Sequence, residues 1–171
     1  MKKISYYFKL LPVFLLILML TACSDDDYNN PPTTTTVVDV AVANGFDSLA
    51  AALIRADLIT TLQGPGPFTV FAPTNDAFGL LLTELGVSGL GDIDEPTLDA
   101  VLKVHVVAGA NVFDTDLTDN LTITTLGGDI TANVTGGVTL TDANGRVSDI
   151  ITTNVQANNG IIHAINKVIL P

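Results

Sequence analysis

Few side chains in this sequence have the chemistry that catalysis requires. The chain of 171 residues contains two histidines, His105 and His163, and a single cysteine, Cys23. A closed zinc site takes four protein ligands, mostly cysteine and histidine, which is more than these three residues can supply. Cys23 lies in a segment that we expect to be processed, so no free thiol remains for a Cys–His nucleophile. These residues therefore favour neither a zinc site nor nucleophilic catalysis.

The remaining catalytic patterns are also missing. The segment Gly86-Val87-Ser88-Gly89 lacks the second glycine of a nucleophile elbow, and the sequence has no phosphate-binding glycine loop. Asp92 and Asp94 could serve as an acid/base pair, but they come just before an expected helix and are better explained as partners of its dipole. We predict that the protein is not an enzyme and uses no cofactor.

One group of acidic residues is a weak candidate for calcium binding. The stretch "DTDLTDN" places Asp114, Asp116 and Asp119 close together in an expected loop. An EF-hand loop takes an acid or amide at its fifth position, Gly at its sixth and Glu at its twelfth, where this chain has Thr118, Asp119 and Thr125. A solvated acidic loop is the alternative, and we expect no metal site.

The sequence around Cys23 points to covalent lipid attachment. Residues 1–9 are short and carry three lysines, and residues 10–20 are almost entirely apolar, which is typical of a signal peptide. The run is too short to span a membrane. Leu20-Thr21-Ala22-Cys23 then resembles the lipobox of bacterial lipoproteins, which implies cleavage between Ala22 and Cys23 and acylation of Cys23. An ordinary secretory signal is the alternative.

Residues 23–35 read as a disordered tether, because they are polar, contain prolines and lack apolar periodicity. The aspartates that follow Cys23 can be interpreted in two ways. They are either a solvated spacer or, with the serine before them, an export tag, since this run resembles the signal that sends some Gram-negative lipoproteins to the cell surface. The residues concerned are Ser24, Asp25, Asp26 and Asp27. We expect an outer membrane lipoprotein exposed at the cell surface.

The balance of acidic and basic residues restricts the kinds of molecule that the protein can bind. Removal of residues 1–22 takes away three of the seven basic residues and none of the 18 acidic ones. A surface this acidic repels phosphate backbones and anionic headgroups, so we expect no nucleic-acid binding and no electrostatic docking on membranes. The membrane contact is expected to come from the acyl chains alone.

Residues 36–171 are expected to form one α+β domain, with helices mainly in the first half. Asp47 and Ser48 can cap a helix that ends near Gln63, and "FTVFAP", residues 68–73, reads as a buried strand. Further helices are predicted over residues 75–85 and from Asp94 onward. The last of these places Leu98, Val101, Leu102 and His105 on one stripe.

From Gly109 onward the apolar residues recur with period two. The short runs are separated by glycine-containing pairs that favour hairpin turns: Gly127-Gly128, Gly136-Gly137, Asn144-Gly145 and Asn159-Gly160. We therefore predict an antiparallel sheet, sandwich or wedge of short strands, with the helices packed at one end.

Three segments in order resemble the motifs of the fasciclin domain. They are "FTVFAPTNDAF" (residues 68–78), "LKVHVVAG" (residues 102–109) and "GIIHAINKVILP" (residues 160–171). The resemblance covers the chain from about Thr36 to its last residue and implies a single fasciclin domain. Two positions depart from the family pattern, since Val104 stands where many members have Tyr and Asn166 where many have Asp.

The motif residues are candidates for core packing or for ligand contact, with packing the better interpretation for the apolar ones. For His105 and His163 we expect hydrogen-bonded structural roles. The residues that the resemblance singles out are Phe68, Thr69, Val70, Phe71, Ala72, Pro73, Thr74, Asn75, Asp76, Ala77, Phe78, His105, Gly160, His163 and Pro171.

Similarity to fasciclin domains implies cell adhesion through contacts with proteins or polysaccharides. Combined with the expected anchor, it predicts a non-catalytic binding module attached to the cell envelope. The alternative is a periplasm-facing lipoprotein that acts as a scaffold or binds a small ligand. A ligand carrier would contain a sizeable apolar cavity, whereas an adhesin would have a filled core and a functional surface.

Overall fold

The computed structural model describes residues 35–171. The predictions for Ala22, Cys23, Ser24 and Asp25 to Asp27 lie outside these residues. None of the helices within residues 35–171 is both long and apolar enough to cross a bilayer.

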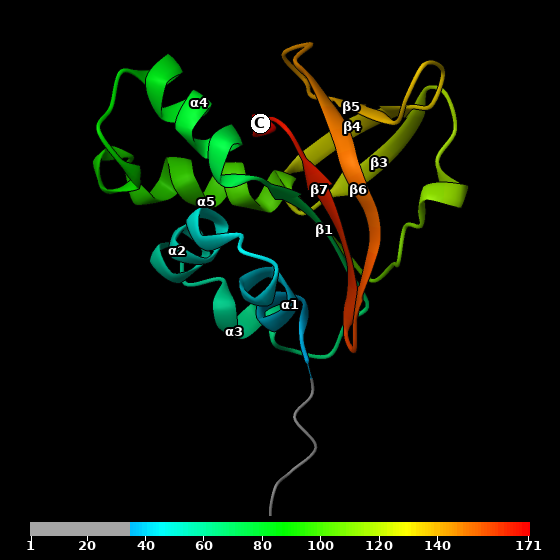
Figure 1. The fold of residues 1–171 in the computed structure, drawn as a ribbon, viewed down its shortest axis with the longest axis horizontal. Coiled ribbons are helices and arrows are strands. Elements are labelled where there is room, and N and C mark those ends of the chain that lie inside the picture. Colours follow the sequence, from blue (N-terminus) through cyan, green and yellow to red (C-terminus); the bar gives the residue numbers. More distant parts are fainter. Residues whose placement is uncertain (1–34) are drawn as a thin grey trace, which may run out of the picture. The chain divides into compact units, whose positions relative to one another are not determined.

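The described residues form an α+β domain, as predicted, with the helices gathered on one side of a sheet (Figure 1). The helices are α1 (Val37–Ala43), α2 (Asp47–Arg55), α3 (Ile59–Leu62), α4 (Asn75–Leu85) and α5 (Glu95–Val104), with short 3₁₀ turns at Leu90–Asp92 and Asp114–Asp116. The strands are β1 (Phe68–Pro73), β2 (Val106–Ala108), β3 (Leu121–Thr125), β4 (Gly128–Asn133), β5 (Thr139–Thr141), β6 (Val147–Ala157) and β7 (Gly160–Ile165).

Two features of the first helices differ from the sequence prediction. Helix α1 was not anticipated, and it begins at a capping box in which the Thr36 hydroxyl and the Asp39 carboxylate each bind the other's backbone N–H. The helix expected from Asp47 to Gln63 is two helices, because the chain turns at Asp57, whose φ is +53°. Asp47 is the first residue of α2 rather than its cap.

The later helices follow the prediction and have clear end signals. The Thr74 hydroxyl accepts a hydrogen bond from Ala77 N–H at the start of α4, and Asp94 does the same from Thr97 N–H at the start of α5. Gly86 ends α4 with a φ of +68°, a left-handed conformation that glycine adopts without a steric penalty.

The sheet has seven strands in the order β2-β1-β7-β6-β5-β4-β3. It is mixed rather than wholly antiparallel, since the last strand, β7, pairs in parallel with β1 over residues 160–165 and 68–73. Both strands are buried along their whole length, as central parallel strands are. Period-two patterning identifies strands but not their neighbours, so the sequence could not predict this pairing.

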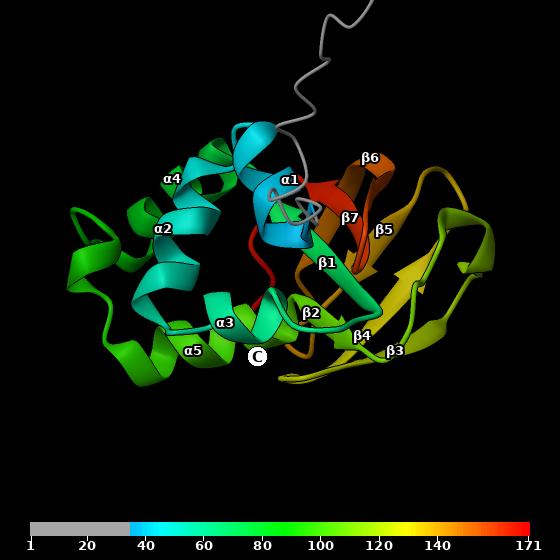
Figure 2. The same ribbon diagram turned by 90° about the horizontal axis from the view of Figure 1, so that it is seen from below.

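The sheet is not a sandwich of two layers but a single sheet that curls until its edges meet (Figure 2). Leu126 N–H, just after β3, donates to the carbonyl of Val106 in β2 at 2.8 Å. The curl separates two cores. Phe68, Val70 and Ala72 of β1 face the helices, whereas Phe71 faces the inside of the curl.

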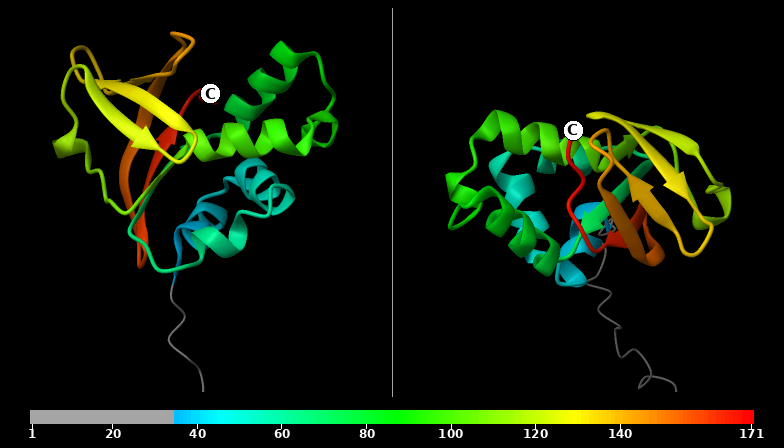
Figure 3. Two further views of the ribbon diagram at one scale, coloured as in Figure 1. Left: turned by 180° about the vertical axis from the view of Figure 1, so that it is seen from behind. Right: turned by 90° about the horizontal axis from the view of Figure 1, so that it is seen from above.

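The end of the chain is held between the helices and the β5–β6 hairpin (Figure 3). Leu170 N–H donates to the Asp142 carboxylate at 3.0 Å, and the Asn144 side chain donates to the Pro171 carbonyl at 3.1 Å. Arg146 joins the same hairpin to Glu84 of α4 at 2.7 Å.

Candidate functional site

His105 lies at the end of α5 and is 1% exposed. Its Nδ1–H donates to the Val101 carbonyl at 2.6 Å, and its Nε2 accepts from Ile169 N–H at 3.0 Å. Burial lowers the pKa of His105 to about 4, against a smaller opposing influence of the bond to Val101. The ring is neutral at pH 7, both nitrogens are occupied, and it ties the end of the chain to α5.

His163 is fully buried in β7 and bonds through both nitrogens as well. Nε2–H donates to the Val112 carbonyl at 2.8 Å, Nδ1 accepts a longer bond from Asn154 N–H at 3.4 Å, and the ring stacks on Phe71 with centroids 5.6 Å apart. Burial lowers its pKa, outweighing the raising effects of the Val112 bond and of Asp114. Neither histidine has a nitrogen free to bind a metal or to transfer a proton.

The three aspartates of the calcium candidate are engaged separately. Asp114 accepts from the Asn154 amide at 2.6 Å, which is the main cause of its lowered pKa, and from the Thr153 hydroxyl at 3.1 Å. Asp116 accepts from a backbone N–H within its own turn. No group of three metal-binding side chains forms within residues 35–171.

Asp119 closes a different loop. Its carboxylate accepts from the hydroxyl and N–H of Thr135 and from Val134 N–H at 2.7 Å, and the Thr135 hydroxyl is the main cause of its lowered pKa. Asp92 accepts from Ser88 N–H at 3.0 Å and Asp94 caps α5, so these two acids hold a loop and a helix start.

Most residues of the first motif build the core. Thr69 is buried, donates through its hydroxyl to the Ala110 carbonyl at 2.9 Å and accepts from Val112 N–H at 2.9 Å. In the second motif, Gly160 lies so close to the Phe68 carbonyl and to Val37 that a β-carbon would overlap both. Packing and hydrogen bonds within the domain therefore account for Thr69 and Gly160, and neither residue needs a ligand to explain it.

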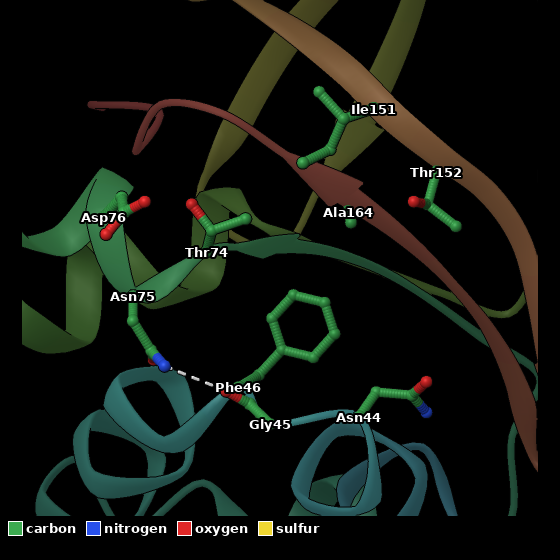
Figure 4. A pocket seen from close by; sticks show the side chains of 9 residues that line it. All are labelled: Asn44, Gly45, Phe46, Thr74, Asn75, Asp76, Ile151, Thr152 and Ala164. Atoms are coloured by element: carbon green, nitrogen blue, oxygen red, sulfur yellow. Dashed lines mark hydrogen bonds between the residues drawn. The ribbon is translucent and has the colours of Figure 1, made fainter.

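The polar end of the first motif, in contrast, lines an open cleft of about 340 Å³ (Figure 4). The cleft lies where the α1–α2 connection, the start of α4 and strands β6 and β7 meet. Its lining residues are Asn44, Gly45, Phe46, Thr74, Asn75, Asp76, Ile151, Thr152 and Ala164. Only Thr74, Asn75 and Asp76 were among the residues singled out from the sequence.

Asn75 fixes one wall of this cleft. Its Nδ2 donates to the Gly45 carbonyl at 2.9 Å, and its Oδ1 accepts from Ser48 N–H at 2.9 Å, so one amide holds both the turn before α2 and the first turn of that helix. The turn itself depends on Gly45, whose φ is +78°. Phe46 follows, and Figure 4 shows its ring standing in the cleft beneath Thr74 and Ala164.

An irregularity in β6 forms the opposite wall. Ile151 and Thr152 are consecutive, and in a regular strand they would point to opposite faces. The register shifts between Ile150 and Thr152 and again before Val155, and both side chains border the cleft. Bulges of this kind commonly re-aim side chains next to binding sites. Ile151 is 54% exposed, so its side chain is accessible at the cleft.

The cleft therefore combines an aromatic ring and an aliphatic side chain with polar groups that have no partner across it. No hydrogen bond joins Asp76 or Thr152 to another lining residue, whereas the Asn75–Gly45 bond is present (Figure 4). None of the lining residues is basic. Sequence reasoning missed the other six lining residues: Asn44, Gly45, Phe46, Ile151, Thr152 and Ala164. The Asn44-Gly45 turn pair was the one local signal that could have suggested the loop.

Comparisons with known proteins agree with this fold. Residues 44–171 match the fasciclin domain family. Two cyanobacterial proteins from Synechocystis are related over 136 residues. The chain is 37% identical to protein sll1483, and the match covers 79% of this chain and 73% of sll1483. It is 38% identical to the uncharacterized protein sll1735, and the match covers 78% of this chain and 96% of sll1735. Human periostin is 31% identical over 77% of this chain, which spans 15% of periostin's length.

A solved structure shows the same arrangement of helices and strands. It is a pair of fasciclin domains from the insect cell adhesion molecule fasciclin I, with a TM-score of 0.66 and 15% identity, covering 80% of this chain and 51% of that one. Fasciclin domains are generally non-catalytic binding domains. The chain belongs to the fasciclin domain family and is related to the bacterial proteins sll1483 and sll1735.

Proposed function

We propose that this protein is a binding module attached to the cell envelope that mediates cell adhesion by binding protein or polysaccharide outside the cell. One observation carries the proposal: a fasciclin fold with both histidines sealed in the core presents a preformed cleft on its surface. A similar fold occurs in the insect cell adhesion molecule fasciclin I. After removal of the signal sequence, the acyl chains on Cys23 and the polar tether would hold the domain on the membrane.

The alternative of a small-ligand carrier receives less support from the structure. An apolar groove of about 240 Å³ lies between α4, α5 and the end of the chain, which is below the roughly 300 Å³ at which pockets for small molecules begin. It is lined by Leu81, Leu85, Ile93, Thr97, Leu98, Val101, Asn144, Leu170 and Pro171. The cleft of about 340 Å³ exceeds that lower limit of roughly 300 Å³, but it is open and partly polar rather than an apolar cavity. Large side chains such as Phe71, Phe78 and Leu102 are fully buried in the two apolar cores.

The proposal can be tested with beads coated with the purified full-length chain. Such beads should retain bacterial cells or immobilised polysaccharide above the level of beads coated with an unrelated acidic protein, which controls for charge. Retention equal to that control for every cell and polysaccharide surface would reject adhesion as the function.

A further inference from the structure

We propose that the cleft between the α1–α2 connection, α4 and β6 binds a sugar unit of an uncharged glycan. The proposal rests on the proposed function, because it names the class of ligand through which the module would adhere. Three features of the cleft favour such a ligand: its apolar floor, the kind and placement of its polar groups, and the absence of basic residues from its lining.

The floor suits the apolar face of a pyranose ring. The Phe46 ring stands in the cleft (Figure 4), and the half-buried side chain packs against the helix-side core, which restrains it. Ile151 adds a second apolar surface on the opposite wall. A flat aromatic ring with one side fixed by packing gives contact area at little cost in conformational entropy.

The polar groups suit a ligand with hydroxyl donors around its perimeter. Asn44, Asp76 and Thr152 lie on three different sides of the Phe46 ring (Figure 4). The Asn44 amide donates its Nδ2 to the Val40 carbonyl at 2.7 Å, which leaves its oxygen to accept. A carboxylate and an amide oxygen accept, and the Thr152 hydroxyl can do either. Acceptors spread around a ring fit a sugar better than a single ammonium group, which would need them clustered at one point.

Charge excludes the acidic glycans. The described residues contain four basic side chains, Arg55, Lys103, Arg146 and Lys167, and none of them lines the cleft. Arg55 binds two backbone carbonyls near residues 90–93, and Lys103 and Arg146 are paired with Asp99 and Glu84. A sulfate or uronate placed beside Asp76 would lose its hydration without gaining a cation.

The cleft is also preorganised, which reduces the cost of binding. The two hydrogen bonds of Asn75 hold the turn that carries Phe46, and the bulge in β6 sets Ile151 and Thr152 on the far wall. A single open site of about 340 Å³ contacts only part of a glycan, so its affinity is expected to be low. Many copies on one cell would compensate through avidity.

The test is an NMR titration of the isotope-labelled full-length chain in detergent. The neutral probes are hexaoses of glucose, mannose, galactose and N-acetylglucosamine. A sulfated hexaose, a hexauronate and a lysine-rich peptide are titrated separately as charged probes. At least one neutral hexaose should give saturable shifts of the Gly45, Asn75 and Thr152 amides. The charged probes should bind there about tenfold more weakly or not at all.

Variants then connect the shifts to the cleft. Phe46→Leu keeps an apolar side chain on the core but removes the flat ring, and Thr152→Val removes one hydroxyl at nearly constant shape. Each should weaken binding, Phe46→Leu by about tenfold. Ile54→Ala, an exposed apolar position on α2 that does not line the cleft, should leave binding unchanged. Unaltered amide spectra outside the cleft would show that the variants fold.

The outcomes separate this inference from the proposed function. If no neutral hexaose shifts the cleft amides, if an acidic glycan or the peptide binds there more tightly, or if Phe46→Leu binds the hexaose as well as the parent chain, the inference is wrong. Beads that retain cells equally with the parent chain and with Phe46→Leu would leave adhesion standing and reject the cleft as its site. Beads of the parent chain that retain nothing would reject adhesion itself.

Discussion

The buried ring of His105 should make the stability of the domain fall as the pH falls from about 6.5 to about 4. An unfolded chain exposes this histidine with a pKa of 6.5, whereas burial lowers the pKa to about 4 in the folded domain. Between these values the unfolded state binds a proton that the folded state does not. The unfolding free energy therefore decreases as the pH falls through this range and stops changing on account of His105 below it.

The size of the effect follows from the two pKa values. Each pKa unit of difference corresponds to about 1.4 kcal/mol, so His105 alone should remove about 3 kcal/mol of stability between pH 6.5 and pH 4. The total unfolding free energy of a domain is typically about 5–15 kcal/mol, so this loss would be a large part of it. His163, whose pKa burial also lowers, should act in the same direction.

Urea unfolding of the full-length chain and of His105→Gln at pH 7, 6, 5 and 4 isolates the contribution of His105. The glutamine cannot reproduce both the bond to Val101 and the bond from Ile169, so the variant should be about 2 kcal/mol less stable at pH 7. Only the parent chain loses stability because this side chain stays neutral in the fold, so the gap should close near pH 5 and reverse by about 1 kcal/mol at pH 4. His163 and the carboxylates are present in both chains and cancel in the difference. A gap that stays constant from pH 7 to pH 4 would refute the reasoning.

Three further changes test contacts that hold the domain together. Asn159→Ala should lower the unfolding free energy by about 3 kcal/mol in urea titrations, because the amide accepts from Val37 N–H and donates to the carbonyls of Leu62 and Gly64; a loss below about 1 kcal/mol would contradict its role. Gly160→Ala should cost about 3 kcal/mol or prevent folding, since its β-carbon would overlap the Phe68 carbonyl. Gly79 lies in α4 with open space around it, so Gly79→Ala should instead raise the unfolding free energy by up to about 1 kcal/mol. Equal effects of the two substitutions would show that close packing is not what makes Gly160 necessary.

The elements that the sequence predicted best are those with dense local signals. The strand over residues 68–73 and the helix over residues 75–85 have the predicted bounds, because Pro73 and Thr74 mark the boundary between a continuous apolar run and a helical pattern. Helix α1 was missed because its sequence, "VVDVAVA", is rich in β-branched valine, which lowers helix propensity. The Thr36–Asp39 capping box was the local signal that could have revealed it.

The parts that could not be predicted depend on contacts between distant segments. The parallel pairing of β1 with β7 joins residues about 90 positions apart in the chain, and the curl of the sheet depends on the meeting of β2 and β3. The cleft depends on a turn at Gly45, the start of α4 and a bulge in β6 coming together. Thr74 and Asn75 were found because they belong to a recognisable motif, whereas Phe46 and Ile151 carry no such signal.

The most direct test of the account is protease treatment of intact cells that express the full-length chain, followed by blotting for the protein with and without lysis. An adhesion module must be displayed outside the cell, so we predict that the signal is lost in intact cells. Replacement of Asp25, Asp26 and Asp27 by alanine should then restore protection if these aspartates are an export tag. Full protection of the parent chain in intact cells, with digestion only after lysis, would contradict the account and place the domain on the periplasmic side.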